Sequence, residues 1–518
     1  MTWGISISSS SAGNHLSIIF LCLLLQNSRA CYKRLVYHGA IPLLYIDDCT
    51  SNYELGLLVG ATFSSTIKGR MRDSLAFQKV QAYCSTNWGR QLLAALKDCH
   101  RIAFPAYFSE LQGLAAGSGV PFDQVFMLNL RQEILAAGES PDVLAGFQQW
   151  LGIRSTGGTS SAERDIDGSN GGRDGDVGRA EGDGRGNGRS LSSIGCATGG
   201  CHGSADGGGD VAVESNRSQP GDGDNNAHVD PSSVDACSDV AVRLRSPDGP
   251  PGSARLILGH NEDMTNDTLG RMYYIRATMP GRGSWFALTY AGELASTAFG
   301  ANTAGVGFTL NALYPSDALL PGLGRNFLSR RLLDAGSVEE ALEVLVERDQ
   351  ATGRSVNLMS TRPPLGVWNV EVGPGGAHDV LELQDNTWYY HANAYMRLPQ
   401  RQKLDNSSVH REARFAQFTM PAGPADVLEM LGDTSDAKFP VYRTGDYGGL
   451  VYTLCTVLYD LSGSRMMVYR GNPRDGVLGS VLDLYTLMPV GPHGGEQKEG
   501  DLAKAVMAEQ DELDEPWV

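Results

Sequence analysis

The residue with the clearest chemical meaning in this sequence is Cys237. It lies in "DACSDVAVRL", where a long glycine-rich tract ends and an alternating apolar run begins. If the peptide bond between Ala236 and Cys237 were cut, Cys237 would carry a free α-amino group beside its thiol. The pKa of such an amine is about 8 and that of a thiol about 8.5, so the amine can accept the thiol proton. One residue would then supply both the nucleophile and its base.

Other interpretations of the cysteines remain open. A cysteine that opens a strand is commonly a small buried residue. A rival Gly195–Cys196 pair in "SIGCATGG" has no strand pattern after it. Cys196, Cys201 and His202 offer metal-ligand atoms, but they lack the two-pair spacing of a zinc site. We therefore favour Cys237 and expect neither a metal nor an organic cofactor.

The elements after Cys237 are predicted to be mainly strands. "SDVAVRL" and "ARLILGHN" flank the turn residues "PDGPPG", which predicts a hairpin that starts at the cysteine. "MYYIRATMP", "SWFALTY" and "GVGFTLNAL" continue as short strands. Helices are predicted in "RNFLSRRLLDAG" and in "SVEEALEVLVERD", where Ser337 and Glu340 have capping-box spacing. Strands return in "SVNLMS", "GVWNVEV", "DVLEL" and "TWYYHAN", followed by a hairpin in "YTLCTVLYDLSGSRMMVYRG".

The chain divides by composition. Residues 34–154 show apolar residues at helical spacing, as in "YELGLLVGATFSSTIKGRM" and "PFDQVFMLNLRQEILAA". Residues 155–231 are dominated by Gly, Asp, Arg, Ser and Asn, and such a composition predicts a disordered insertion. Residues 237–495 form the strand-rich part, and 496–518 an acidic tail. Runs of strands beside helix pairs favour a layered α+β domain.

Residues 1–30 resemble a secretory signal peptide. "HLSIIFLCLLL" has the length of its apolar region, and "NSRA" places small residues where cleavage would occur. No Lys or Arg precedes the apolar run, so a wrongly assigned start or a buried apolar segment is the alternative. Asparagines in glycosylation sequons fit a secretory or vesicular location, with the cytoplasm as the alternative; they are Asn216, Asn266 and Asn406. We expect no membrane span in the mature chain.

Composition limits the class of partner. The chain has 518 residues, 42% of them hydrophobic and 19% charged, which suits a globular core. Its net charge of −17 argues against a nucleic-acid partner, because phosphate binding needs clustered Lys and Arg. The nine cysteines lack the regular spacing of a disulfide scaffold, so we expect mostly buried or free thiols.

Several motifs together resemble one known family. "ACSDVAV" followed by "LGHNEDM" resembles two segments of the isopenicillin N acyltransferase family, which includes the β-alanyl-dopamine hydrolases. "MLNLRQEI", "GANTAGVGFTLNALYP", "YYHANAYM" and "FPVYRTGDYGGLVYTLCTVLYD" resemble that family in the same order, from about Ile41 to Arg470 without the insert. The resemblance implies a four-layer αββα N-terminal-nucleophile fold. It also implies a precursor that cuts itself at the cysteine, which would leave a heterodimer of two chains.

The resemblance assigns roles to single residues. It makes Cys237 the nucleophile of both self-cleavage and catalysis, and Asp263 the group that orients the new α-amino group. Asn393 and Asn311 would stabilise the oxyanion. Arg443 could hold a substrate carboxylate bidentately. Without the resemblance, the aspartate is a turn residue, the asparagines end strands and the arginine is solvated.

The implied reaction is acyl transfer from a small N-acyl amine or β-alanyl amide to water or another amine, through a thioester. A papain-like peptidase is disfavoured because the "CGSCW"-type signature is absent. A third interpretation is an unprocessed, inactive N-terminal-nucleophile-like protein that binds ligands. Ala236 motivates it, because the family usually has glycine there and the extra carbon could hinder self-cleavage.

Overall fold

The computed structural model describes residues 31–38, 41–139, 141–150, 236–245, 254–279, 281–445 and 450–490. The predicted signal peptide, the predicted disordered insert with Cys196, Cys201 and His202, the sequon at Asn216 and the acidic tail lie outside the described residues. Ala236 and Cys237 lie inside them, at the start of the strand that the sequence predicted.

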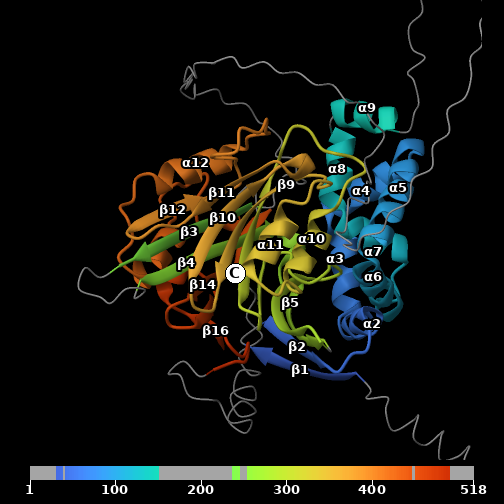
Figure 1. Ribbon diagram of the computed structural model, residues 1–518. Helices are drawn as coiled ribbons and strands as arrows, with labels where there is room; N and C mark the ends of the chain where they lie inside the picture. The colour runs from blue at the N-terminus through green and yellow to red at the C-terminus, as the bar shows by residue number, and fades with distance from the viewer. Residues whose placement is uncertain are drawn as a thin grey trace, which may run out of the picture.

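Two sheets carry the described strands (Figure 1). The first sheet has nine strands, in the order β1 (Tyr32–His38), β2 (Ile41–Asp47), β5 (Met272–Met279), β6 (Gly283–Tyr290), β7 (Phe299–Asn302), β8 (Val306–Leu313), β9 (Gly353–Ser360), β10 (Gly366–Val372) and β11 (His378–Glu382). The second has seven, in the order β12 (Thr387–His391), β3 (Ala236–Leu244), β4 (Arg255–Thr265), β14 (Val451–Asp460), β15 (Arg465–Tyr469) and β16 (Leu478–Asp483), with β13 (Thr444–Gly445) beside β14.

The N-terminal part of the chain begins with a hairpin that the helical periodicity did not predict. β1 and β2 pair antiparallel, and β2 then pairs parallel with β5, so that Leu43 lies beside Tyr274. β2 is buried along most of its length and shows no clean alternation. A strand that is buried on both faces lacks the period of two that sequence reasoning looks for.

Helices cover the outer faces of both sheets. Against the first sheet lie α2 (Asn52–Thr62), α3 (Ser64–Asp73), α4 (Leu75–Cys84), α5 (Asn87–Ala103), α6 (Pro105–Ser118), α7 (Phe122–Asn129), α8 (Arg131–Glu139), α9 (Pro141–Trp150), α10 (Arg325–Leu332) and α11 (Val338–Leu345). Against the second lie α12 (Asn406–Phe415) and α13 (Pro424–Leu431). The predicted cap of α11 is present, since Ser337 Oγ accepts the backbone N–H of Glu340.

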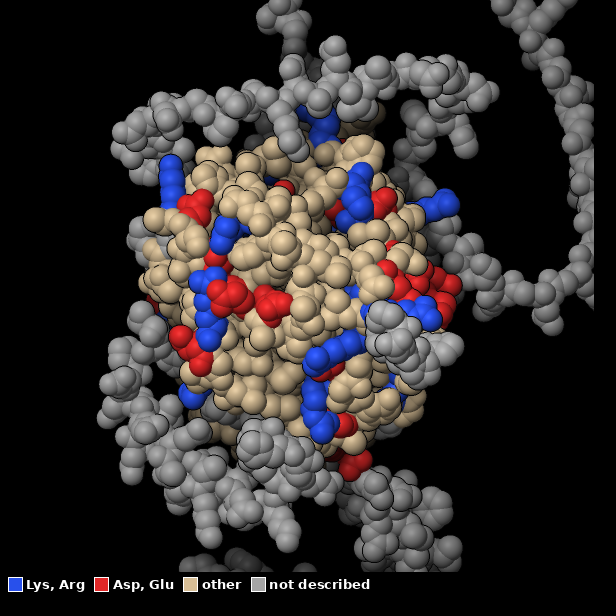
Figure 2. Space-filling model, turned by 90° about the vertical axis from the view of Figure 1, so that its left-hand side faces the viewer, with Lys and Arg blue, Asp and Glu red and all other residues tan. Residues whose placement is uncertain are grey.

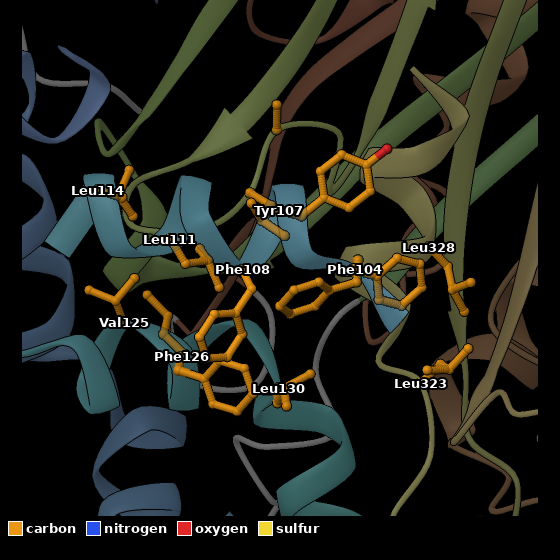
Figure 3. Close-up of a cluster of buried hydrophobic side chains, with 14 of the residues drawn as sticks. Phe104, Tyr107, Phe108, Leu111, Leu114, Val125, Phe126, Leu130, Leu323 and Leu328 are labelled. Carbon is orange, nitrogen blue, oxygen red and sulfur yellow. The ribbon is translucent and has the colours of Figure 1, made fainter. Parts of the chain in front are cut away.

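Three buried cores separate these layers. The first joins the helices α2–α11 to the first sheet, and Figure 3 shows part of it, where Phe108 of α6 lies near Phe126 of α7. The second core lies between the sheets and contains Tyr274 and Leu258. The third joins Val240 of β3 to α12 and α13. The order helix, sheet, sheet, helix is the αββα architecture, so the predicted fold class is confirmed.

No helix among the described residues is both long enough and apolar enough to cross a membrane.

Candidate active site

Cys237 is the second residue of β3, and the hairpin register determines its surroundings. Ala236 pairs with Asp263 of β4, and Cys237 pairs with Glu262. Side chains alternate along a strand, so Cys237 lies on the same face of the second sheet as Ala241, which belongs to the core between the sheets. Asp263 lies on the same face as Ile257, which packs towards α12 and α13. The cysteine and the motif after it therefore meet across one hairpin.

The backbone of Cys237 is held at both polar atoms. Its N–H donates to Asn393 Oδ1 at 2.9 Å. Its carbonyl oxygen accepts a hydrogen bond from the Arg411 guanidinium, and the same arginine donates to Asn393 Oδ1 at 2.9 Å. Arg411 lies on α12 and is fully buried. The sequence did not predict this role of Arg411. The spacing of residues along a helix does not show which strand the helix contacts.

The Cys237 thiol faces a carboxylate. Its Sγ lies 3.9 Å from Glu262 Oε2. Burial raises the pKa of the thiol well above its ordinary value, and the negative charges of Glu262, Asp263 and Asp239 add to that shift. The uncharged thiol is therefore the stable form here, and a base is needed to make it nucleophilic.

A chain of buried charges continues from that carboxylate. Glu262 Oε2 accepts from His260 Nε2 at 2.8 Å, and His260 Nδ1 donates to Asp239 Oδ1 at 2.7 Å. The Tyr290 hydroxyl donates to Glu262 Oε1. Burial alone would lower the pKa of His260, but the carboxylates of Asp239 and Glu262 overcome it and raise that pKa to about 10. His260 is thus an imidazolium between two carboxylates at neutral pH.

His260 and Glu262 belong to the motif "GHNED", but the sequence alone assigned them no role. The signal was available in the period of two. Cys237 and Asp239 share one face of β3, and His260 and Glu262 share one face of β4. The four side chains form one cluster because the strand register pairs Asp239 with His260 and Cys237 with Glu262.

Two of the predicted site residues, Asp263 and Arg443, form an ion pair in the structure. Asp263 Oδ1 accepts from Thr453 Oγ1 at 2.6 Å, and its Oδ2 lies 3.4 Å from Arg443 Nε. The Arg443 guanidinium also donates to Ser407 Oγ. Both side chains are fully buried. This geometry makes Arg443 a partner of Asp263, while its predicted contact with a substrate carboxylate stays a prediction.

The two predicted oxyanion asparagines both lie near Cys237. Asn393 follows β12, and its Nδ2 donates to Ala312 O at 3.0 Å. Asn311 of β8 donates from Nδ2 to Ala392 O at 3.0 Å and lines the cavity beside Cys237. The asparagines thus cross-link β8 to the segment after β12 and place amide groups beside the cysteine. Their oxyanion role stays a prediction.

A small cavity of about 20 Å³ adjoins Cys237, Glu262 and Tyr290. Its wall also contains three arginines, which are Arg131, Arg325 and Arg354. A second cavity of about 300 Å³ shares Arg325 with the first and is lined by apolar and polar groups, among them Leu135, Leu313 and Tyr314. Its size lies at the lower end of ligand pockets, so a small substrate would fit.

One cluster among the described residues offers ligands for a metal. Cys237, His260 and Glu262 each present one ligand atom, and these atoms lie within 4.8 Å of one another. Thiolate, imidazole and carboxylate are the ligands that Zn²⁺ prefers. In the structure, Glu262 Oε2 accepts hydrogen bonds from both Cys237 Sγ and His260 Nε2. The three ligand atoms therefore already have hydrogen-bond partners within the cluster.

Comparison with known proteins gives two sequence matches. Residues 250–475 match the family model described as acyl-coenzyme A:6-aminopenicillanic acid acyl-transferase. The chain is also 25% identical over 475 residues to the β-alanyl-dopamine/carcinine hydrolase of Drosophila melanogaster, which covers 86% of this chain and 96% of that protein.

The chain also matches solved structures at low identity. One is the Caenorhabditis elegans orthologue of N-acylethanolamine-hydrolyzing acid amidase, with 13% identity and a TM-score of 0.31 over 44% of this chain and 93% of that chain. Another is the conjugated bile acid hydrolase of Clostridium perfringens, with 11% identity and a TM-score of 0.29 over 49% of this chain and 95% of that chain.

Proposed function

We propose that this chain, which matches the family model of acyl-coenzyme A:6-aminopenicillanic acid acyl-transferase and resembles a β-alanyl-dopamine/carcinine hydrolase, is a self-processing cysteine amidohydrolase. These matches support an enzyme of the hydrolase and acyltransferase type that acts on amides. The finer proposal is that Cys237 becomes the N-terminal nucleophile of a second chain. The observation that carries it is the placement of Cys237, whose backbone N–H and carbonyl are both anchored and whose thiol borders a cavity.

The proposed reaction uses the α-amino group as base. The free amine of Cys237 takes the thiol proton, and the sulfur attacks the carbonyl carbon of the substrate amide. Asn311 and Asn393 are the amide donors proposed to stabilise the resulting oxyanion. The tetrahedral intermediate collapses, the carbon–nitrogen bond breaks, and the leaving amine receives the proton. Water or a second amine then attacks the thioester and restores the thiol.

The proposed substrates are small N-acyl amines, with β-alanyl amines first among them. The cavity of about 300 Å³ supports a small substrate. The Drosophila relative is named for β-alanyl-dopamine and carcinine, so a panel built around β-alanyl amines is the natural starting point.

The decisive experiment compares Cys237→Ala with native protein. Cleavage is followed by intact mass and N-terminal sequencing, and turnover by release of free amine from the panel. We expect native protein to yield a second chain that begins Cys-Ser-Asp-Val. Cys237→Ala should stay uncut and lose activity by at least about 10³-fold, because no other group at that position can form the thioester.

Two control variants sharpen this test. Cys455→Ala removes another buried thiol, which lies opposite Glu262 on the neighbouring strand β14. Cys196→Ala removes the rival cysteine. Both should retain cleavage and turnover. Processing that survives Cys237→Ala would refute the assignment, and an uncut native chain that binds the amines without turnover would favour a ligand-binding protein.

We also propose a secretory or vesicular location. Cys31 and Cys49 form a disulfide, which suits an oxidising compartment, while Cys84, Cys237 and Cys455 are buried free thiols of the kind we expected. Cys31 directly follows the predicted signal peptide. The sequon residues Asn266 and Asn406 are both exposed, so a glycan would meet no packed surface there.

A further inference from the structure

Self-cleavage poses a problem that turnover does not. Before the cut, the nitrogen of Cys237 belongs to a peptide bond, and its N–H donates to Asn393. An amide nitrogen is not basic, so the α-amino base of the mature enzyme does not yet exist. Burial and neighbouring carboxylates also raise the pKa of the thiol, so spontaneous ionisation is disfavoured. The uncut chain therefore needs a different proton acceptor.

Glu262 occupies the position that such an acceptor needs. It lies directly opposite Cys237 in the β3–β4 register, and its Oε2 is 3.9 Å from the sulfur. The Glu262 side chain is 4% exposed, so bulk water does not compete freely for the proton. Because the contact joins two strands of one hairpin, it forms as soon as that hairpin does.

Neighbouring groups aim this carboxylate at the sulfur. The Tyr290 hydroxyl of β6 donates to Oε1, and His260 Nε2 donates to Oε2 at 2.8 Å. His260 is held in turn by Asp239 at 2.7 Å. With His260 and Asp239 on the hairpin and Tyr290 on the facing sheet, the side chain of Glu262 is held from both layers.

We propose that Glu262 is the base of self-cleavage, accepting the Cys237 thiol proton in the uncut chain. The inference rests on the proposed function, since it concerns the same cleavage. The sulfur then attacks the Ala236 carbonyl carbon and the carbon–nitrogen bond to Cys237 breaks. The proton returns from Glu262 to the departing nitrogen, and water hydrolyses the thioester. This leaves a carboxylate on Ala236 and a free amine and thiol on Cys237.

His260, Asp239 and Tyr290 are positioning residues in this scheme. They touch the carboxylate, or each other, and none is needed to carry the thiol proton. The titratable groups around Glu262 are Cys237 and Asp239 of β3, His260 of β4, Tyr290 of β6 and Cys455 of β14. The charged groups in the wall of the cavity that Glu262 lines are Arg131, Arg325 and Arg354.

The test is Glu262→Gln in the full chain, made by cell-free translation so that cleavage can be followed from time zero. We expect the rate of fragment appearance to fall by about 10²-fold or more, the usual effect of losing a general base. The residual rate should rise about tenfold per pH unit, because hydroxide must replace the lost base, whereas native cleavage should depend less steeply on pH.

Glu371→Gln is the matched control. Glu371 is also a buried carboxylate bonded to a histidine, since His391 Nε2 lies 3.0 Å from its Oε1, but it is not paired with a thiol. It should cleave at the native rate. Circular dichroism and thermal melting of both variants establish that they fold.

A second measurement distinguishes a role of Glu262 as the base of cleavage from a role in holding the active site together. Turnover of the Glu262→Gln protein is divided by the cut fraction found by mass spectrometry. We expect turnover per cut chain to fall by less than about tenfold, because the α-amino group then serves as base. Equal losses in cleavage and turnover, or native cleavage by Glu262→Gln, would overturn the proposal. Cleavage by Cys237→Ala would instead defeat the proposed function itself.

Discussion

Three charged side chains are buried next to Cys237. Asp239, His260 and Glu262 are all fully or nearly fully buried, and each is paired with another member of the cluster. Breaking a buried pair by removing one partner is costly, because the remaining charge stays buried without compensation. His260 is the central member, since its two nitrogens serve both carboxylates.

This arrangement makes stability depend on pH. The pKa of His260 is raised to about 10 in the folded chain, against an ordinary value of about 6.5. Its contribution to the free energy of unfolding is therefore complete below about pH 6.5 and is lost as pH rises towards 10. Between pH 7 and pH 10, we expect Cys237→Ala protein to lose on the order of 2 kcal/mol more than the double variant with His260→Gln.

Urea unfolding at several pH values measures this difference, and the Cys237→Ala background keeps both proteins as one chain. Parallel curves for the two proteins would show that His260 does not carry the imidazolium charge in the folded state.

At the level of elements, the helix pair α2 and α6 has an unusually close contact. Gly56 and Gly60 of α2 face the backbone of α6, and Gly113 and Gly117 of α6 face the backbone of α2. A Cβ at Gly113 would lie 2.0 Å from Tyr53 O, which no real side chain could do. The pair supports the helical layer that covers the first sheet.

Gly113→Ala should therefore destabilise the protein by about 1–3 kcal/mol, because α2 and α6 must separate to admit the methyl group. Gly146→Ala is the control, since a Cβ at that helical position meets nothing within 4 Å. Alanine there should be neutral or stabilising by up to about 1 kcal/mol. Thermal melting of both variants checks this, and equal melting temperatures would contradict the close contact.

The sequence predicted these elements unevenly. The strands around Cys237 and the helix capped by Ser337 were predictable, because alternation and capping are local signals. β1 and β2 were not, since β2 is buried on both sides by partners far away in the sequence. The Cys237–Glu262 contact was equally inaccessible, because it depends on register rather than on either strand alone.

At the scale of the whole molecule, the distribution of surface charge bears on the class of partner. On the face shown in Figure 2, acidic and basic groups are interspersed on a largely uncharged surface. The net charge of −17 argues against a nucleic-acid partner, and that expectation stays a prediction. The domain division at the glycine-rich insert stays a prediction, because residues 155–231 lie outside the described residues.

The proposed secretory route has a direct test at this scale. Expressed in a eukaryotic cell with its own N-terminus, the protein should carry glycans at Asn266 and Asn406, both exposed. Treatment with an endoglycosidase should then shift its mass, and the shift should shrink in Asn266→Gln and disappear in the variant that lacks every sequon. An unglycosylated chain retained in the cytosol would contradict the proposal.

The parallel pairing of β2 with β5 has a kinetic consequence. β2 precedes the proposed cut and β5 follows it, yet both lie inside one sheet and share its cores. In the uncut chain, β2 and β5 belong to one polypeptide, so their pairing forms within a single molecule. Once cut, the two chains would have to find each other again after denaturation, in a reaction that slows with dilution. Maturation would thus turn a protein that can refold into one that folds only once, whose durability is set by its unfolding rate.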